Sequence, residues 1–252
     1  KEINYFLDIF CGGCNVSINS NAKTILCNDK ESEIINLFRS IKRIDTSECI
    51  KLIKSIIEDF DLSKENEEGY KNLRKYFNEG HRDWNIFYNL VVHSFNNQIR
   101  FNSKKEFNLP FGFRTFNAQL QDKFYVFAET LKQKDISFFN ENFKDICIDD
   151  FTAKDLIYCD PPYLITTASY NENNGWNINN EQDLLNFLDY VNSKNIKFAL
   201  SNVFENKGKS NDILKKWATK YNIHYLNNSY SNCNYQIKNR VNKTIEVLIT
   251  NY

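Results

Sequence analysis

Short apolar runs and amphipathic stretches alternate along the first part of the chain. An apolar run from Tyr5 to Phe10 ends in the pair Gly12-Gly13, and a stretch that is compatible with a helix follows it. A second short run, Lys23 to Cys27, precedes the amphipathic segment Ser32 to Ile41. Strand, helix, strand and helix at this spacing predict the opening of a parallel sheet.

The pattern changes from about Asp45 to Phe127, where helical periodicity dominates and a loop contains Pro110 and Gly112. Strand patterns then return at Ile136 to Phe139, Leu156 to Cys159, Lys197 to Ser201, Ile223 to Leu226 and Thr244 to Thr250. Helical patterns accompany them at Glu181 to Val191 and Asp212 to Tyr221. We therefore predict a doubly wound α/β domain in two parts, residues 1–44 and 127–252, with a helical domain inserted at residues 45–126.

Composition and charge narrow the class of protein. Hydrophobic residues make up 42% of the chain and charged residues 25%, which is typical of a folded globular protein. No run approaches the roughly 20 apolar residues of a membrane span, and no signal peptide is recognisable, so we expect a cytoplasmic protein. The formal net charge is zero, so any surface that binds nucleic acid must be local.

The three prolines of the chain fall in two places, and one of them predicts chemistry. Asp160-Pro161-Pro162-Tyr163 directly follows the strand pattern Leu156 to Cys159, and open α/β sheets bind ligands at the carboxyl ends of their strands. The prolines fix the backbone and remove two N–H donors, which leaves carbonyl groups, a carboxylate and an aromatic ring. This set suits an amino group on a planar ring: the carboxylate and the Pro161 carbonyl accept its hydrogens, and Tyr163 stacks on the ring.

A second candidate site is the glycine turn in Asp8-Ile9-Phe10-Cys11-Gly12-Gly13, which lets the backbone approach a cofactor closely. Asp29 ends the next strand pattern, where an acidic side chain conventionally binds the ribose of an adenosine-containing cofactor. The turn lacks both the fuller glycine pattern of a dinucleotide site and the Gly-Lys-Ser/Thr run of a P-loop. The pair therefore favours an adenosyl cofactor without phosphates.

Six ordered segments resemble the adenine-N6 DNA methyltransferases of the DNA adenine methylase (Dam-like) family. They are Asp8 to Gly13, Asn28-Asp29, the segment from Arg100 to Gly112, Asp160 to Tyr163, Leu200-Ser201-Asn202 and Glu246 to Tyr252. The resemblance implies a Rossmann-like seven-stranded mixed sheet with an inserted helical target-recognition domain. It also implies transfer of a methyl group from S-adenosylmethionine to the N6 amino group of an adenine flipped out of duplex DNA.

The resemblance also assigns roles to particular residues. The catalytic residues are expected to be Asp160, Pro161, Pro162 and Tyr163. The residues that bind S-adenosylmethionine are expected to be Asp8, Phe10, Gly12, Asp29, Asn142 and Asp160. Those that contact DNA, through phosphates or a guanine, are expected to be Arg100, Asn102, Lys104, Asn108, Pro110 and Arg114.

Further expectations follow from the resemblance. The partner is double-stranded DNA, with no metal and no membrane, and the protein is a monomer encoded by a bacterium or a phage. GATC is the first expectation for the target sequence, and a restriction-modification system is an expected context. The polar segment Ser231 to Lys243 is a candidate second arm near the duplex.

The chain departs from the family pattern in three places. The family's leading segment, with a lysine that helps to hold the cofactor, is missing before the first strand. Asn142-Phe143 stands where the family has Asp-Phe, and Asn97 replaces a glycine ahead of Arg100. The first departure keeps open the possibility of an inactive protein that binds cofactor and recognises DNA.

Two rival classes of protein share part of this pattern. Cys11-Gly12-Gly13-Cys14, between a strand and a helix, is where the cysteine pair of a thioredoxin-like protein would lie, although such a protein has no use for Asp160 to Tyr163. An RNA amino methyltransferase would share the cofactor fold, but the segment Arg100 to Gly112 favours DNA.

Overall fold

The computed structural model describes residues 2–166, 176–226 and 244–252, and the candidate arm Ser231 to Lys243 lies outside these ranges. The chain divides into two compact units, residues 1–30 with 141–252, and residues 31–140. The second unit contains the whole range 45–126 that the sequence assigns to an inserted domain. Among the described residues, no helix is long and apolar enough to cross a bilayer.

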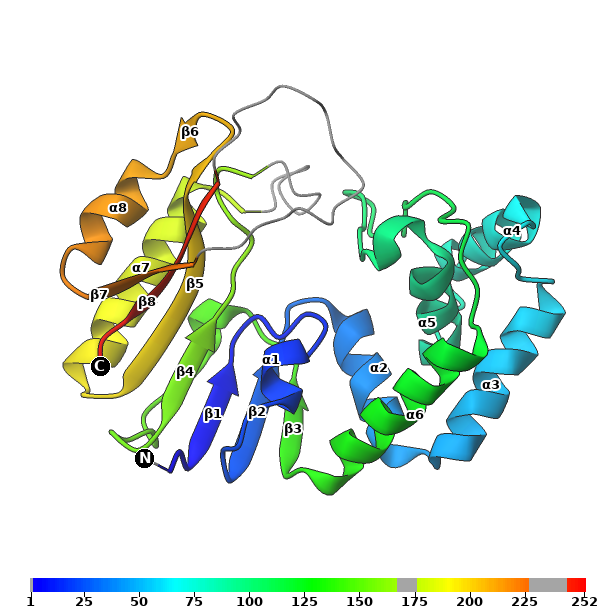
Figure 1. Cartoon of the computed structure of the whole chain (residues 1–252), viewed down its shortest axis with the longest axis horizontal. Coiled ribbons are helices and arrows are strands. Elements are labelled where there is room, and N and C mark those ends of the chain that lie inside the picture. The colour runs from blue at the N-terminus through cyan, green and yellow to red at the C-terminus, as the bar shows by residue number, and fades with distance from the viewer. Residues whose placement is uncertain (1, 167–175, 227–243) are drawn as a thin grey trace. The chain divides into compact units, whose positions relative to one another are not determined.

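The first unit is built on a mixed sheet (Figure 1). In chain order its elements are β1 (Tyr5–Asp8), α1 (Asn15–Ile18), β2 (Thr24–Asn28), the short 3-10 helix η2 (Phe143–Asp145), β4 (Leu156–Cys159), α7 (Ile178–Ser193), β5 (Lys197–Asn206), β6 (Lys209–Ser210), α8 (Asp212–Ala218), β7 (Asn222–Leu226) and β8 (Ile245–Thr250). The strand order is β3-β2-β1-β4-β5-β8-β7, with β6 paired to β5 and β3 being Ile136–Phe139. This confirms an α/β fold with a seven-stranded path.

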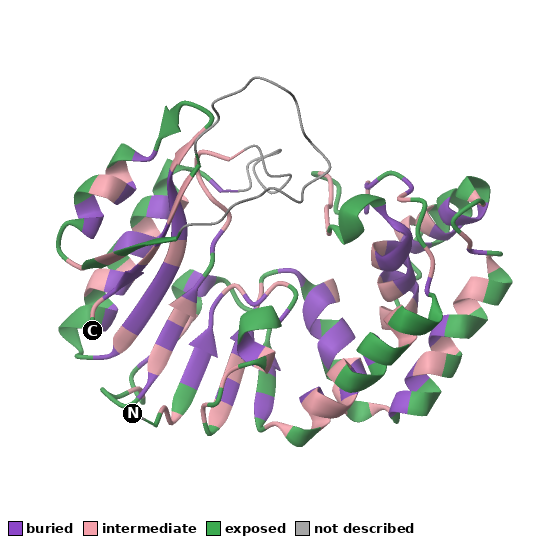
Figure 2. Ribbon diagram, in the orientation of Figure 1, coloured by how far each residue is buried: buried purple, intermediate pink, exposed green. Residues whose placement is uncertain are grey.

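The hydrogen-bond pattern shows why the sheet is mixed. Strand β1 pairs in parallel with β2 and β4, and β4 pairs in parallel with β5. Strand β8 instead runs antiparallel to both β5 and β7. Strands β1, β2 and β4 are short, and the buried side chains of the parallel strands form the core with α7, as the purple strands of Figure 2 show. Carboxyl ends of β1, β2, β4 and β5 consequently meet at one edge of the sheet.

The second unit is mainly helical. It contains α2 (Ser32–Arg43), α3 (Thr46–Asp59), α4 (Glu67–Asn78), α5 (Trp84–His93), the 3-10 helix η1 (Phe95–Asn97), α6 (Ala118–Gln133) and β3. Helix α2 buries Ile34, Ile35, Leu37, Phe38 and Ile41, the spacing of one helical face. Four aromatic rings, those of Phe77, Phe87, Phe101 and Phe107, pack against one another in its core.

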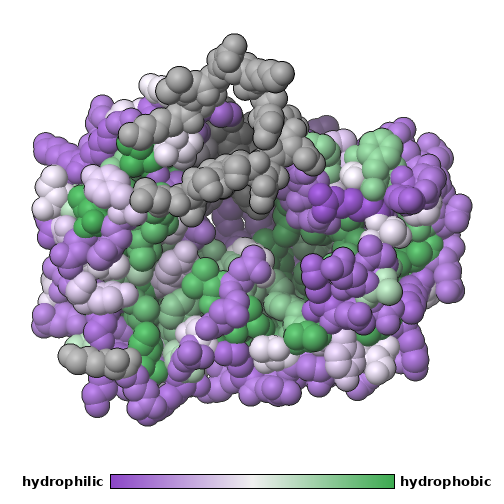
Figure 3. Space-filling view, in the orientation of Figure 1, coloured by the Kyte–Doolittle hydropathy of each residue, from purple (hydrophilic) through white to green (hydrophobic). Residues whose placement is uncertain are grey.

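Asparagine has a structural role at several helix starts. The side chains of Asn66, Asn117, Asn177 and Asn211 each accept a hydrogen bond from a backbone N–H in the first turn of α4, α6, α7 and α8. Such caps stabilise a helix by about 1 kcal/mol each. Most of the surface that either unit displays in Figure 3 is hydrophilic, in keeping with the apolar residues being used in the two cores.

Candidate active site

Three polar side chains lie where neighbouring parallel strands end. Asp8 is the last residue of β1, Asn28 is the last of β2, and Asp160 directly follows β4. In the sheet register Asp8 is level with Cys27 on one side and with Tyr158 on the other. The structure therefore brings the predicted cofactor segments and the predicted catalytic segment to the same edge of the sheet.

The glycine turn after β1 is held by β2. Gly12 has a φ of +44°, a left-handed conformation that glycine adopts without strain. Its backbone N–H donates to the Asp29 carboxylate at 3.0 Å, and the Cys11 N–H donates to the Asn28 carbonyl at 2.9 Å. Asp29 and Gly12, both predicted to bind the cofactor, are thus in direct contact.

Asn28 joins three segments at this edge, and the sequence did not single out its side chain. Its amide group donates to the carbonyls of Ile9 at 3.1 Å and Glu141 at 3.0 Å, and its oxygen accepts from the Glu141 N–H at 2.9 Å. The Asn28 side chain therefore fixes the chain after β1, the end of β2 and the start of the segment that carries Asn142. In the sequence only the position of Asn28 at the end of an apolar run distinguishes it, and that position does not reveal its partners.

Asp8 is buried, with 2% of its surface exposed. One carboxylate oxygen accepts from the Ser17 hydroxyl at 2.5 Å, whereas the other, Oδ1, is buried without a hydrogen-bond partner among the described residues. Burial raises the pKa of Asp8 to about 7, with the nearby Cys27 and Asp160 adding to the rise, while the Ser17 hydrogen bond opposes it. An unpaired buried carboxylate oxygen is costly and suits a donor supplied by a ligand.

Three aromatic rings form a cluster beside the glycine turn. Phe10 lies 5.6 Å from Phe143 and 5.6 Å from Trp176, and the last two rings lie 5.7 Å apart, measured between centroids. Trp176 and Phe143 are buried and Phe10 is partly buried. Asn142, another predicted cofactor residue, is exposed, and its side chain accepts from the Lys144 N–H at the start of η2.

Asp160 and Tyr163 contact each other at the end of β4. The Tyr163 hydroxyl donates to Asp160 Oδ1 at 2.8 Å and lies 3.3 Å from the Ser201 hydroxyl on β5. Of the two prolines between them, Pro161 is buried and Pro162 partly buried. Asp160 itself is exposed to solvent, yet protein groups crowd its carboxylate, and the resulting desolvation raises its pKa against the opposing hydrogen bonds from Tyr163 and Ser201.

The cysteines near the glycine turn do not form a redox site of the thioredoxin kind. Cys11 and Cys14 are buried, and the sulfur of Cys14 lies 3.9 Å from that of Cys27. Contact with the neighbouring thiol and burial raise the pKa of both Cys11 and Cys14. A reactive cysteine pair instead needs a lowered thiol pKa and access to solvent.

The segment from Arg100 to Gly112 forms a closed loop in the second unit. Phe101 and Phe107 pair as an isolated bridge, and Arg100 donates to the side chain and to the carbonyl of Asn108, at 2.8 and 3.0 Å. Asn102 accepts from the backbone N–H groups of Lys104 and Glu106. Asn102 and Asn108 therefore shape the loop and orient Arg100.

The other predicted DNA-binding residues are exposed. Lys104, Pro110 and Arg114 all lie at the surface, and the Arg114 guanidinium donates to the Asn97 side chain at 2.6 Å. Asn97, which stands where the family has glycine, has a φ of +52° and so keeps a left-handed conformation that asparagine tolerates. Its side-chain amide donates to the carbonyls of Val91 and Val92.

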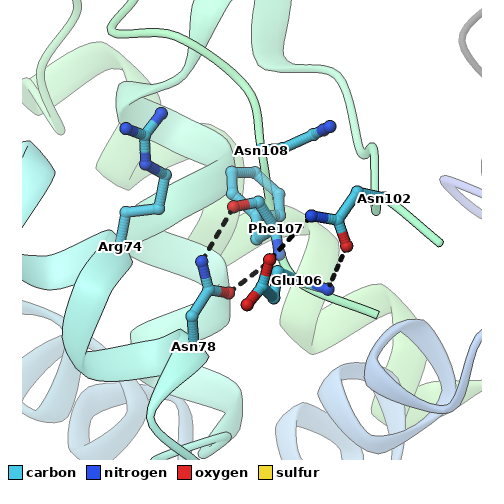
Figure 4. Close-up of a pocket in the computed structure, with 6 residues that line it drawn as sticks. All are labelled: Arg74, Asn78, Asn102, Glu106, Phe107 and Asn108. Atoms are coloured by element: carbon cyan, nitrogen blue, oxygen red, sulfur yellow. Dashed lines mark hydrogen bonds between the residues drawn. The ribbon is translucent and has the colours of Figure 1, made fainter. Parts of the chain in front are cut away.

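An open pocket of about 280 Å³ adjoins this loop (Figure 4). Arg74 and Asn78 contribute from α4; Asn78 brackets Phe107 by accepting from its N–H at 2.8 Å and donating to its carbonyl at 3.1 Å. Five polar residues and one phenylalanine line it: Arg74, Asn78, Asn102, Glu106, Phe107 and Asn108. The sequence did not point to Arg74 or Asn78, because each is one polar residue among many on an amphipathic helix.

Comparison with known proteins places this arrangement in a family. The model of the D12 class N6 adenine-specific DNA methyltransferases matches residues 1–232. The chain belongs to this family. It is 42% identical to the type II methyltransferase M.FokI of Planomicrobium okeanokoites and 40% identical to the modification methylase StsI of Streptococcus sanguinis, in both cases over its whole length. It covers 39% of each of these relatives, and is 28% identical to a DNA adenine methylase of Serratia marcescens over 71% of the chain and 66% of that protein.

The D12 family uses S-adenosylmethionine, and the residues at the strand ends fit that cofactor. Oδ1 of Asp8, which has no hydrogen-bond partner among the described residues, would accept from the cationic methionine part, and the Asp29 carboxylate beside Gly12 would accept from ribose hydroxyls. Phe10, in its aromatic cluster, offers an apolar surface for the adenine ring. No group of His, Cys, Asp or Glu among the described residues is arranged to hold a metal ion.

Proposed function

We propose that this chain carries the methyl-transferring domain of a DNA methyltransferase that acts on the N6 amino group of adenine. The observation that carries the proposal is the pairing of Asp160 with Tyr163 at the end of β4, beside the buried Asp8 and the glycine turn. Membership of the D12 family supports both the reaction and the cofactor.

The chemistry follows from the groups that surround the amino nitrogen. S-adenosylmethionine supplies an electrophilic methyl group on a sulfonium. The Asp160 carboxylate and the Pro161 carbonyl accept the two amino hydrogens, which favours a pyramidal nitrogen with an exposed lone pair. Because its pKa is raised, Asp160 is also a better proton acceptor than an ordinary aspartate as the nitrogen gains its methyl group and loses a proton.

Tyr163 has two roles in this proposal. Its ring stacks on the flipped adenine, and its hydroxyl donates to Asp160 Oδ1 and thereby orients the carboxylate. That hydrogen bond also opposes the rise in the pKa of Asp160 that desolvation causes, and so favours the ionised form. Ser201 supports the same arrangement from β5.

Double-stranded DNA is the proposed substrate because the second unit offers local cationic groups on a chain of zero net charge. Arg100 is held in place by Asn108, and Arg74 lines the adjoining pocket. Guanidinium groups on a polar, open surface suit phosphates or a guanine edge. We propose that residues 45–126 of this unit are the target-recognition domain.

The relatives M.FokI, a type II methyltransferase, and StsI, a modification methylase, support a place in a restriction-modification system. Recognition of GATC rests on the resemblance of the segment Arg100 to Gly112 to the Dam-like enzymes. We therefore make the target sequence the first variable of the test.

The experiment measures transfer of labelled methyl from S-adenosylmethionine to unmethylated duplexes with and without GATC, and to RNA of the same sequences. Label in adenine of duplex DNA supports the proposal, and its distribution among the duplexes identifies the target. Label in RNA would show that RNA and not DNA is the substrate. Cofactor binding without any transfer would point to an inactive recognition protein.

A variant pair links the reaction to the proposed site. We expect Asp160→Ala to reduce turnover by at least about 100-fold, the usual scale for a group that acts in the transition state, while the Kd for S-adenosylmethionine changes by less than about fivefold. Asp150→Ala, an exposed aspartate ahead of β4, is the matched control and should behave as wild type. Near-normal turnover of Asp160→Ala would contradict the mechanism.

A further inference from the structure

Glu181, in the first turn of α7, is a fully buried carboxylate with 0% of its surface exposed. It accepts three hydrogen bonds: from Trp176 Nε1 at 2.6 Å, from the Asn211 amide at 2.8 Å and from the Asn202 amide at 3.3 Å. All three donors are neutral, and burial raises the pKa of Glu181 despite them. Burial of a carboxylate costs desolvation free energy, and this one joins three segments of the chain by hydrogen bonds. We therefore expect these hydrogen bonds to serve a function.

The first of these hydrogen bonds leads to the cofactor residues. Trp176 packs edge-on against Phe10 and also contacts Phe143. Because the indole N–H is fixed on Glu181, the ring has one orientation, and Phe10 is confined against it. Glu181 therefore determines the shape of the aromatic cluster beside the glycine turn.

A second hydrogen bond leads to the proposed adenine site. Asn202 follows Ser201 on β5, and the Ser201 hydroxyl lies 3.3 Å from the hydroxyl of Tyr163, which donates to Asp160. The pairing of β5 with β8 shifts register between Val203 and Glu205, so the strand is irregular just after this point. The bond from Asn202 to Glu181 anchors β5 where the regular ladder ends.

We propose that Glu181 is a positioning residue for methyl transfer, acting through Trp176 on cofactor binding and through Asn202 and Ser201 on the Asp160–Tyr163 pair. This inference rests on the proposed function. It assigns the two effects to different measurable constants: the Trp176 branch controls the Kd for S-adenosylmethionine, and the Asn202 branch controls kcat.

Three variants separate the branches. Trp176→Phe keeps a ring and removes the N–H, so we expect the Kd to rise by about fivefold, the effect of one hydrogen bond, with kcat at saturating cofactor unchanged. Asn202→Ala should lower kcat by about fivefold and leave the Kd unchanged. Glu181→Gln is nearly isosteric but replaces one acceptor oxygen by a donor, so it should shift the Kd, kcat or both, and combining it with Trp176→Phe should add no further change in Kd.

The control is a second carboxylate of the same helix. Asp189 accepts from Trp217 Nε1 at 2.9 Å and from the Tyr221 hydroxyl at 2.6 Å, in contacts that do not involve the proposed site. Asp189→Asn should lower Tm while leaving both constants unchanged. Titration calorimetry gives the Kd without any turnover, and single-turnover transfer gives the rate.

The outcomes are distinguishable. If wild type is active and Glu181→Gln resembles Asp189→Asn, with a lower Tm but with Kd and kcat within twofold of wild type, Glu181 is purely structural and the inference is wrong. Additive effects of Glu181→Gln and Trp176→Phe on the Kd would also overturn it. A wild-type chain that neither binds S-adenosylmethionine nor transfers methyl overturns the proposed function and this inference with it.

Discussion

Asp8 provides a quantitative test of the electrostatics at the strand ends. The side chain is 2% exposed, one of its oxygens is unpaired among the described residues, and its pKa is raised from 3.8 to about 7. The perturbation is Asp8→Asn, which keeps the size of the side chain and an oxygen to accept from Ser17 but removes the titration.

The sign of the effect follows from proton linkage. The unfolded chain releases the Asp8 proton near pH 3.8 and the folded chain near pH 7, so between these values the unfolded state binds fewer protons. The free energy of unfolding therefore decreases as the pH rises through this window. At about 1.4 kcal/mol per pKa unit, the full rise in pKa corresponds to about 4 kcal/mol. The free energy of unfolding of Asp8→Asn does not decrease in this way, so the stability of this variant relative to wild type should increase by about 4 kcal/mol from pH 4 to pH 8.

The assay is denaturant unfolding of wild type and Asp8→Asn without cofactor at closely spaced pH values. The quantity that matters is how the difference between their free energies of unfolding changes with pH. A constant offset from the buried amide does not affect it. Asp155→Asn is the control: Asp155 is equally buried near the start of β1, but its oxygens accept from the Tyr5 and Thr152 N–H groups and from the Thr152 hydroxyl. A difference between Asp8→Asn and wild type that stays constant from pH 4 to pH 8 would refute the reasoning.

Three further predictions concern single contacts. Tyr163→Phe removes the hydroxyl that lowers the pKa of Asp160, so the acidic limb of the profile of turnover against pH should move to higher pH. If the limb does not move, the Tyr163 hydroxyl does not influence the titration of Asp160. Gly112→Ala places a Cβ 2.1 Å from the Ser94 carbonyl oxygen and should weaken DNA binding without changing the Kd for S-adenosylmethionine. Gly80→Ala meets no atom within 4 Å but strains a backbone with a φ of +115°, so it should lower stability without weakening DNA binding. Arg74→Gln should reduce the slope of log K for DNA against log salt by about one phosphate contact. Lys71→Gln changes a surface lysine that pairs with Glu67 and should have less effect. Equal slopes for wild type and both variants would show that Arg74 does not contact DNA.

Strand positions in the sheet were predictable because short apolar runs bounded by polar residues leave few possible assignments. Ile136–Phe139 and Leu156–Cys159 have the predicted bounds, and β1 ends two residues earlier than its apolar run. Strand β5 continues to Asn206, beyond the predicted Ser201, because its later residues are buried against β8 and α8, a tertiary effect that local pattern does not contain. The two-residue strand β6 carries no signal of its own in the sequence.

The motif residues of the candidate site could be named from the sequence, whereas the residues that fix their positions by hydrogen bonds could not. Asp8, Gly12, Asp29, Asp160 and Tyr163 stand at strand ends in a recognisable order, and the structure brings them to one edge of the sheet. Asn28 and Glu181 hold this edge through hydrogen bonds to segments farther along the chain, Asn28 to Glu141 and Glu181 to Asn202 and Asn211. An asparagine or a glutamate in an asparagine-rich, charged chain is unremarkable until its partners are known.

The two carboxylates at the strand ends also suggest an order of events under the proposed function. Without ligand, Asp8 and Asp160 both have raised pKa values, and the charge of Asp160 is among the causes for Asp8. A cationic cofactor at this edge lowers the pKa of both groups by opposite charge. Asp160 is then ionised, and able to accept from an adenine amino group, at a lower pH than in the empty site. Cofactor binding would thus prepare the adenine site electrostatically, and the affinity for S-adenosylmethionine should increase as the pH rises through about 7 in wild type and lose the Asp8 part of this dependence in Asp8→Asn.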